Sequence, residues 1–537
     1  MSLNSVTSRR LRAALFVCVL LAAAGLRLPH LAQRPLHTDE AVHAVKFGLL
    51  LEKGDYRYDP YEYHGPALVY LTLIPAALRQ QSTFAELDEI TLRIVPLFFG
   101  LALTAIPLAF RRLLPKGAAF WAALLTAVSP AMVFYSRYYI MEMLLVFFTA
   151  CFLLALWKFL TQGGILWGAA LGLSMGLMHA SKETFILSWA AAAAAVAFLA
   201  VGKQTKFSCA KLEVKAILVA FAAALLVSGL FFSSFGKNPR GIIDSVMTYA
   251  VYFSRGAGHG SAHVYPWYAY FKWLGWNYTH GKPFWSEAAI LLLGLVGCAA
   301  AWRPNAEESK AFQRFLCLYT LILTALYSLI PYKTPWSMLS FLHGWILLAS
   351  AGIADLLKRA PKKLLQHLYL LFALASLHLG LQAFQQNRQY DTDSSNPYVY
   401  AHTHRDLFRL VQAVEQLSAA SPLGKDEYIE IICPNDDYWP LPWYLRRFRR
   451  VGYFSAVNFD LPAARLIIAK PEVENDLLKK LYELPPPGQQ YLYLPFFAHP
   501  LWLRDGVEIG LYVRKDLWDQ WYYSDQREGS DMAGDSR

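Results

Sequence analysis

Two adjacent carboxylates, Asp39 and Glu40, come first among the residues of this sequence that could do chemistry. They lie in the segment LHTDEAVHA, about ten residues beyond the first apolar run. A carboxylate can take a proton from a reacting group, and a positioned general base contributes about 10² to 10⁴ in rate. The same pair also fits a structural role, because acidic side chains at the start of a helix accept hydrogen bonds from its free N–H groups.

A second candidate segment is SRYYIMEM, residues 136–143, in which Arg137 and Glu142 enclose Tyr138 and a second tyrosine. Arg137 could bind an anion, and Glu142 could act as an acid or a base. The alternative is an arginine that reaches toward lipid headgroups with a glutamate paired to it. Both interpretations place the segment at the end of a membrane helix.

Two further junctions between apolar runs carry a lysine. HASKETF contains Lys182 and Glu183, and PYKTPW contains Tyr332, Lys333 and Trp336. Neighbouring helical residues point apart, so the residues of the first pair can serve different partners. The prolines of the second motif are also explained as helix terminators.

Three cations are thus predicted at headgroup depth, on Arg137, Lys182 and Lys333. Preorganised positive charge stabilises a departing phosphate, so such cations could bind an anionic lipid phosphate. A carboxylate facing them could take a proton. The hypothesis requires the early acidic pair and the later cations to meet at the same water–lipid boundary.

The elements that must position these residues are membrane helices. Of the 537 residues, 56% are hydrophobic and 17% are charged, and the mean hydropathy is positive. A soluble chain of this length would not have this composition. The basic residues behind the net charge of +11 stand in short clusters between apolar runs, which indicates membrane topology and no nucleic acid partner. The six cysteines form no CxxC pair, and no metal site is predicted.

Eleven runs are apolar enough to be predicted as membrane-crossing helices. They lie near residues 13–29, 95–111, 118–134, 140–160, 164–180, 185–202, 216–235, 286–302, 313–331, 336–356 and 364–384. The first resembles a signal peptide, but the later spans favour an uncleaved helix. Alternate loops are rich in lysine and arginine, so the positive-inside rule predicts a cytoplasmic N-terminus and an external C-terminus.

The predicted fold is an all-α polytopic membrane domain, residues 1–384, with long outer loops at 30–94 and 236–285. The first outer loop is too long for a connector. Its apolar periodicity predicts two half-buried helices, near 40–52 and 66–78. All candidate residues then fall on the outer side of the membrane.

The composition becomes that of a soluble domain from residue 385. YIEIICP, ARLIIAKP and VEIGLYVRK predict short strands, and PLPWYLRRF predicts a helix opened by proline. A small extracytoplasmic α/β domain is therefore expected for residues 385–524, followed by a disordered tail at 525–537.

Several motifs, in order along the chain, resemble those of a known class. HTDEAVHA, YHGPALVYLT, SPAMVFYSRYYIMEM, SKET and YKTPW are similar to motifs of GT-C fold glycosyltransferases of the protein-mannosyltransferase and aminoarabinose-transferase type. The sequence resembles most closely the prokaryotic family called flippase-activity-associated proteins, to which DYWPLPWYLRRF is also similar.

This resemblance implies that Asp39 is the catalytic carboxylate, with Glu40 beside it. Glu142 would correspond to the acidic residue that such enzymes carry in their second outer loop. Relatives with a metal site have an acidic-x-acidic motif there, whereas Met143 and Leu144 follow Glu142 in this chain. No cofactor is therefore predicted as required, and a divalent cation, Mg²⁺ or Mn²⁺, is left open.

The expected function is transfer of a sugar from a polyprenyl-phosphate donor to an acceptor protein or glycolipid, with inversion in one displacement. Asp39, Glu40 and Glu142 are the catalytic candidates. The substrate-binding candidates are His64, Arg137, Tyr138, Lys182, Glu183, Tyr332, Lys333 and Trp336. Membrane lipids are the other expected partners. The expected location is the plasma (inner) membrane, with the site facing the periplasm or the cell exterior.

Two noncatalytic alternatives fit the same motifs. One is a flippase-associated or transport component that moves a lipid-linked sugar without making a bond. Transporters tend to place charge at mid-membrane within broken helices and repeats, whereas the apolar runs here are nearly free of interior charge. The other is an assembly subunit, since the outer domain shows no recognisable catalytic constellation.

Overall fold

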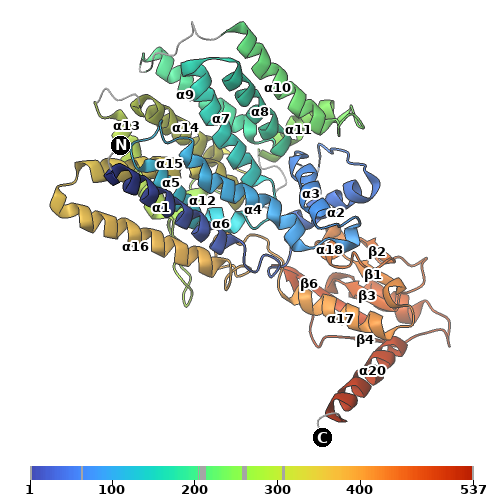
Figure 1. Ribbon diagram of the computed structural model, residues 1–537. Coiled ribbons are helices and arrows are strands. Elements are labelled where there is room, and N and C mark those ends of the chain that lie inside the picture. The colour runs from blue at the N-terminus through green and yellow to red at the C-terminus, as the bar shows by residue number, and fades with distance from the viewer. Residues whose placement is uncertain are drawn as a thin grey trace. The chain divides into compact units, whose positions relative to one another are not determined.

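The computed structural model describes residues 3–61, 64–203, 205, 213–256, 263–304 and 309–534 (Figure 1). The chain divides into two compact units. The helical unit comprises Met1–Leu31, Leu49–Ser82 and Asp88–Tyr400, and the sheet unit comprises Ala32–Gly48, Thr83–Leu87 and Ala401–Arg537. The predicted boundary lay between residues 384 and 385, whereas in this division residues 385–400 belong to the helical unit and two short N-terminal segments belong to the sheet unit.

The helical unit consists almost entirely of α-helices. In chain order they are α1 (Leu3–Arg27), α3 (Ala67–Leu78), α4 (Glu89–Ala105), α5 (Ala118–Val128), α6 (Pro130–Tyr135), α7 (Glu142–Gln162), α8 (Ile165–Ser181), α9 (Phe185–Val201), α10 (Val214–Phe232), α11 (Gly241–Gly256), α12 (Ala269–Gly275), α13 (Ala288–Trp302), α14 (Ser309–Leu329), α15 (Leu339–Arg359) and α16 (Lys362–Gln386). Helix α2 (Thr38–Lys53) begins in the sheet unit and ends in the helical unit. Helices α2 and α3 confirm the two helices predicted in the first outer loop.

Six helices of the described ranges are long and apolar enough to cross a membrane. They are Glu89–Leu108, Glu142–Gln162, Val214–Phe232, Lys310–Leu329, Pro335–Arg359 and Lys362–Gln386. The other five predicted spans coincide with shorter apolar helices: Ala13–Arg27, Ala118–Val128, Ile165–Ser181, Phe185–Val201 and Ala288–Trp302. Every predicted span therefore contains a helix, and the number of eleven crossings stays a prediction.

The predicted span at 118–134 is divided, because α5 ends at Val128 and α6 begins at Pro130. Proline has no N–H to donate and is favoured at the first position of a helix. Ser129 caps the new helix by accepting a hydrogen bond from the Met132 N–H at 3.4 Å. The chain therefore restarts a helix at this point.

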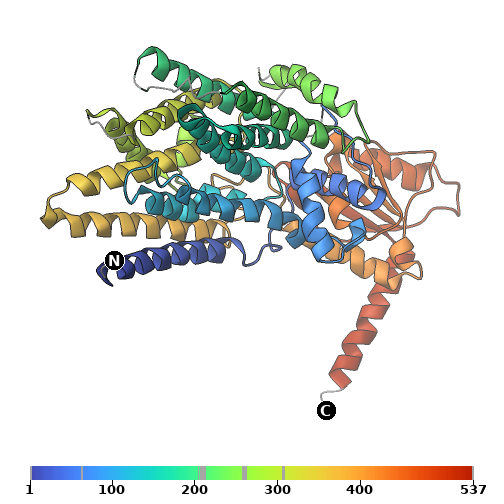
Figure 2. The ribbon, with the colours of Figure 1, turned by 45° about the horizontal axis from the view of Figure 1, so that its top comes forward.

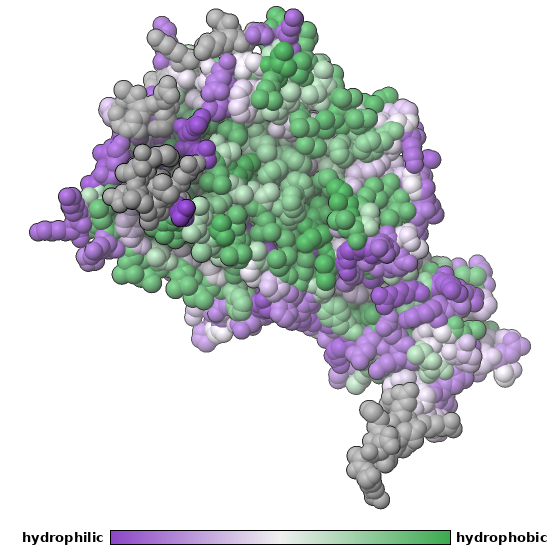
Figure 3. All heavy atoms as spheres, in the orientation of Figure 1, coloured by the Kyte–Doolittle hydropathy of each residue, from purple (hydrophilic) through white to green (hydrophobic). Residues whose placement is uncertain are grey.

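The face of the helical unit that Figure 3 shows is strongly apolar. In the apolar stretches of α10 and α16, only 11% and 17% of the residues are buried within the protein. Exposed apolar surface on this scale requires a nonaqueous surrounding. The chain is a multi-pass membrane protein.

The sheet unit contains one mixed sheet of six strands in the order β2-β1-β3-β6-β4, with β5 paired to β6. The strands are β1 (Ile429–Ile432), β2 (Val451–Phe454), β3 (Leu466–Ala469), β4 (Tyr493–Pro495), β5 (Leu501–Arg504) and β6 (Val507–Arg514). Strand β1 is parallel to β2 and β3, and β6 is antiparallel to its three neighbours. Strands β1, β3 and β6 confirm the three predicted strands.

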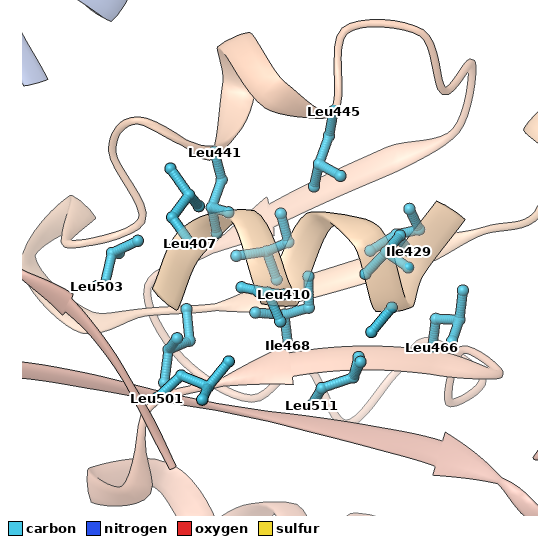
Figure 4. Close-up of a cluster of buried hydrophobic side chains, with 14 of the residues drawn as sticks. Leu407, Leu410, Ile429, Leu441, Leu445, Leu466, Ile468, Leu501, Leu503 and Leu511 are labelled. Atoms are coloured by element: carbon cyan, nitrogen blue, oxygen red, sulfur yellow. The ribbon is translucent and has the colours of Figure 1, made fainter. Parts of the chain in front are cut away.

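Helices complete the sheet unit: α17 (Asp406–Ala420), α18 (Leu441–Tyr444), α19 (Glu474–Leu478) and α20 (Lys515–Gly534). Helix α18 confirms the helix predicted in PLPWYLRRF. Leu407 and Leu410 of α17 point toward Ile429, Ile468 and Leu511 of the sheet (Figure 4). Their three-residue spacing places one face of α17 on the sheet.

The C-terminal region differs from its prediction. Helix α20 runs to Gly534, through residues assigned to a disordered tail. Trp518 and Trp521 at its start pack against the core of the sheet unit, which anchors the helix. Residues 535–537 lie outside the described residues.

Candidate functional site

Asp39 and Glu40 both lie in the first turn of α2, but their carboxylates have different environments. Glu40 is fully buried, accepts a hydrogen bond from the His37 N–H at 2.9 Å and pairs with Arg34 at 3.0 Å. The Asp39 side chain is 43% exposed, and its Oδ1 lies 3.9 Å from His37 Nδ1. Glu40 therefore stabilises the start of the helix, while the Asp39 carboxylate is open to a substrate.

Hydrogen bonds and a ring contact from distant parts of the sheet unit hold the segment that carries Asp39. The Leu36 N–H donates to the Tyr444 hydroxyl at 2.8 Å, and the Thr403 hydroxyl donates to the Leu36 carbonyl at 2.6 Å. The rings of His37 and His402 pack edge to face with centroids 5.4 Å apart. Sequence reasoning did not find these partners, because hundreds of residues separate them from α2.

We expect Tyr444→Phe to loosen this segment. The substitution leaves the Leu36 N–H without its hydroxyl partner, and an unsatisfied buried donor costs about 1 to 3 kcal/mol. Hydrogen exchange read by mass spectrometry should show faster exchange in peptides that cover residues 32–40. Tyr523→Phe, at a side chain 62% exposed in the same unit, is the control and should leave those peptides unchanged. Equal exchange in both variants would show that Tyr444 does not hold the segment.

Lys182 and Glu142 form a buried ion pair within the helical unit. Their residues are 5% and 3% exposed, and Lys182 Nζ donates to Glu142 Oε1. The second oxygen, Oε2, is buried and has no hydrogen-bond partner in the described part of the chain. Burial opposes the charge on Lys182, but the Glu142 carboxylate outweighs it and raises the pKa of the ammonium. Moving two charges out of water costs free energy, so a buried ion pair adds little net stability. This favours a functional role for Lys182 and Glu142.

Glu183, the neighbour of Lys182, collects a separate set of polar partners. Its carboxylate accepts from the Tyr58 hydroxyl at 3.1 Å and lies 2.8 Å from His64 Nδ1. The Tyr252 hydroxyl lies 2.7 Å from the same nitrogen, and the Tyr249 hydroxyl donates to the Glu183 carbonyl at 3.2 Å. Burial would raise the pKa of Glu183, but the contact with His64 and the nearby Lys182 ammonium together outweigh burial and lower it. As predicted for adjacent residues, Lys182 and Glu183 serve different partners.

Glycine is required beside His64. A Cβ atom at Gly65 would lie 2.3 Å from the carbonyl oxygen of Ala180, so only glycine lets this loop approach the end of α8. The motifs HGP and SKET, more than 100 residues apart in sequence, thereby meet in the structure.

The side chains of Arg137 and Tyr138 contact other parts of the helical unit and support the fold. The Arg137 guanidinium donates to the carbonyl oxygens of Arg27, Pro29 and His30 at 2.6 to 2.9 Å, which satisfies groups at the end of α1. Tyr138 is fully buried, with its ring against those of Phe134 and Tyr135. This geometry gives no support to the prediction that the two residues bind substrate.

The YKTPW residues are also closely packed. Lys333 is 1% exposed and its Nζ donates to the carbonyls of Ile330 and Tyr265. The Tyr332 ring packs against His263. Trp336 is buried and packs against Tyr135 and Tyr400. Of the three predicted phosphate-binding cations, Lys182 donates to a carboxylate, and Arg137 and Lys333 donate to backbone carbonyls.

Sequence analysis did not single out Glu287, although it is fully buried. Its carboxylate accepts from the Ser129 hydroxyl, the Ala131 N–H and the Tyr398 hydroxyl at 2.5 to 2.7 Å. These contacts hold the interruption between α5 and α6. The only signal in the sequence was an acidic residue just before an apolar run.

No group of three or more His, Cys, Asp or Glu side chains that could hold a metal ion occurs among the described residues. The expectation that the chain requires no metal stays a prediction.

The chain has the fold of GT-C glycosyltransferases. Residues 54–236 match the family model described as dolichyl-phosphate-mannose-protein mannosyltransferase. This segment includes the HGP, RYYIMEM and SKET motifs. The narrower resemblance to flippase-activity-associated proteins stays a prediction.

Two sets of solved structures share this fold. ArnT from Cupriavidus metallidurans in the apo state is 14% identical, with 94% of this chain and 98% of that chain covered and a TM-score of 0.60. The same protein bound to undecaprenyl phosphate gives a TM-score of 0.59, with 14% identity and coverage of 93% and 97%. The archaeal oligosaccharyltransferase AglB from Archaeoglobus fulgidus, in complex with an inhibitory peptide and a dolichol-phosphate, is 13% identical, with coverage of 87% and 70% and a TM-score of 0.57. A comparison with curated protein sequences gives no match.

Proposed function

We propose that this chain is a membrane glycosyltransferase that uses a polyprenyl-phosphate-linked sugar as donor. The observation that carries the proposal is a fold shared over 93% of this chain with a protein solved with undecaprenyl phosphate bound. The match of residues 54–236 to a mannosyltransferase family supports the same class. The acceptor would be a protein or a glycolipid.

The proposed reaction is a single displacement at the anomeric carbon. The acceptor hydroxyl or amide forms a bond to that carbon and gives its proton to the Asp39 carboxylate. The bond between the anomeric carbon and the phosphate oxygen breaks, and its electron pair leaves with the polyprenyl phosphate. Attack from the face opposite the phosphate inverts the anomeric configuration.

The residues have distinct proposed roles. The exposed Asp39 carboxylate would act as base, whereas the buried Glu40 would hold the helix start. Lys182 would stabilise charge on the leaving phosphate, because an ammonium has three donors and Glu142 Oε1 takes one of them. Glu142 would keep Lys182 charged.

The proposed location follows from charge in the loops. Clusters of lysine and arginine in alternate loops favour a cytoplasmic N-terminus. The candidate residues would then act on the periplasmic or external side of the plasma membrane.

Proteoliposomes test this function against transport. The purified full chain is reconstituted with a polyprenyl-phosphate donor whose sugar is radiolabelled, together with membrane extract as the acceptor source. We expect label in a product that resists the mild acid that cleaves sugar phosphates. Movement of labelled donor across the bilayer with no such product would overturn the proposal and favour a flippase component.

A further inference from the structure

Helix α11 has an inverted pattern of burial. Up to Phe253, the large exposed residues of α11 are all apolar: Ile242 46%, Ile243 63%, Val246 66%, Met247 54% and Phe253 79%. Its buried residues include the polar Asp244, Ser245 and Thr248. A helix that faces water shows the opposite arrangement. The outer face of α11 therefore suits hydrocarbon, although the sequence places it in an outer loop.

The apolar face of α11 adjoins a helix that already faces lipid. Helix α11 follows α10 and lies at its end (Figure 1 and Figure 2). A Cβ atom at Gly241 would lie 2.0 Å from the Phe232 carbonyl oxygen, so glycine allows the close turn from α10 into α11. The Ile242 side chain lies 4.0 Å from the place of a Cβ at Gly229 of α10. The two apolar surfaces are thus continuous.

Basic residues stand where α11 begins. The Arg240 side chain is 82% exposed and its Nε lies 3.6 Å from Asp244 Oδ1. Lys237 is exposed and its ammonium donates to the Gly54 carbonyl at 2.8 Å. Basic residues at the edge of an apolar helix face are typical of helices that lie in the membrane interface, where they meet lipid phosphates.

The inner face of α11 contacts the candidate site of the helical unit. The Thr248 hydroxyl donates to the Pro60 carbonyl at 3.0 Å. Tyr249, the next residue, contacts Glu183, and Tyr252, about one turn beyond Thr248, contacts His64. One short helix therefore has a lipid-compatible face and a face that holds the polar network.

We propose that α11 lies in the membrane interface with its apolar face among bilayer acyl chains, and that this lipid contact keeps Tyr249 and Tyr252 against Glu183 and His64. The occupant is bulk phospholipid, because the face continues that of a membrane helix and begins at exposed cations. The inference does not depend on the proposed function, and Tyr249 and Tyr252 are positioning residues in it.

Photolabelling tests the placement on the unmodified chain. Nanodiscs of phosphatidylethanolamine and phosphatidylglycerol carry a phospholipid with a diazirine in its acyl chain, and no sugar donor is present. After irradiation, mass spectrometry should find adducts at Ile243, Val246 or Met247 and none at Ser245 or Thr248. A lack of adducts on α11, or equal labelling of both faces, would overturn the proposal.

A second arm separates bulk lipid from a polyprenyl tail. The same nanodiscs, now without labelled phospholipid, receive a diazirine-bearing polyprenyl phosphate. The proposal predicts adducts on α11 from the phospholipid probe of the first arm and far fewer from the polyprenyl probe of this arm. Labelling by the polyprenyl probe alone would assign the face to that lipid and overturn the proposal.

Charge on the apolar face tests the coupling to the network. Val246→Glu should lower the phospholipid adducts on α11 by about tenfold, because a carboxylate is costly among acyl chains. It should also speed hydrogen exchange in peptides that cover residues 56–61 and 64–66. Leu423→Glu, at a side chain 50% exposed in the sheet unit, is the matched control and should change neither readout. Reduced adducts with unchanged exchange would refute the coupling.

Discussion

Asp39→Asn should reduce sugar transfer by about 10² to 10⁴ while the protein keeps its fold, because an amide has the shape of the carboxylate and cannot act as a general base. The side chain is 43% exposed, and its Oδ1 lies 3.9 Å from His37 Nδ1, so little stability depends on its charge. Initial rates with labelled donor and thermal unfolding of the same preparations measure the two effects. Undiminished turnover would remove Asp39 from the mechanism.

Two variants serve as controls for Asp39→Asn. Glu89 also lies in the first turn of a helix, α4, and Glu89→Gln should leave transfer unchanged. Glu40→Gln should instead lower the unfolding midpoint, because Arg34 would keep a buried charge without its anionic partner. Breaking a buried pair in this way costs about 3 to 5 kcal/mol. A catalytic loss in Glu40→Gln at full stability would reverse the roles assigned to the two carboxylates.

Lys182→Met should reduce both stability and transfer, because it leaves the Glu142 carboxylate buried without its partner. Loss of one member of such a pair costs about 3 to 5 kcal/mol. The double variant Glu142→Gln with Lys182→Met removes both charges, so it should recover most of the unfolding midpoint. It should not recover transfer, since the leaving phosphate would still lack its cation.

The sheet unit offers a matched pair for this test. Lys480 and Glu430 are 2.7 Å apart, with side chains 4% and 1% exposed. Lys480→Met should destabilise the protein by a similar free energy and leave the rate of folded enzyme unchanged. If the Glu142–Lys182 double variant regained full transfer, Lys182 would serve only to balance the charge of Glu142 and would not bind the phosphate.

Local patterns predicted much of the fold. The periodicity of the first outer loop located α2 and α3, and alternation of apolar residues located β1, β3 and β6. The interruption at Pro130 was readable from proline chemistry, but the apolar run that surrounds it concealed the break. The polar composition of residues 525–537 predicts a disordered tail, while helix α20, anchored at its start by Trp518 and Trp521, is assigned as far as Gly534.

The environment of the candidate residues was harder to predict. Asp39 and Glu40 are adjacent acids with the same local pattern. Glu40 is buried against Arg34 and His37, whereas Asp39 is exposed, and these contacts cannot be predicted from the spacing of the two acids. Arg137 looked available for an anion because its carbonyl partners, at the end of α1 and just beyond it, are more than 100 residues away. The meeting of His64 with Glu183 depends on the close approach at Gly65, which spacing along the chain does not express.

The lipid product of the reaction tests the central claim most directly. Purified chain is incubated with a polyprenyl-phosphate-linked sugar and acceptor membranes, and the lipids are quantified by mass spectrometry. The account predicts free polyprenyl monophosphate, one molecule for each sugar transferred, released about 10² to 10⁴ times more slowly by Asp39→Asn. Sugar transfer without release of polyprenyl monophosphate, or release of a polyprenyl diphosphate, would contradict it.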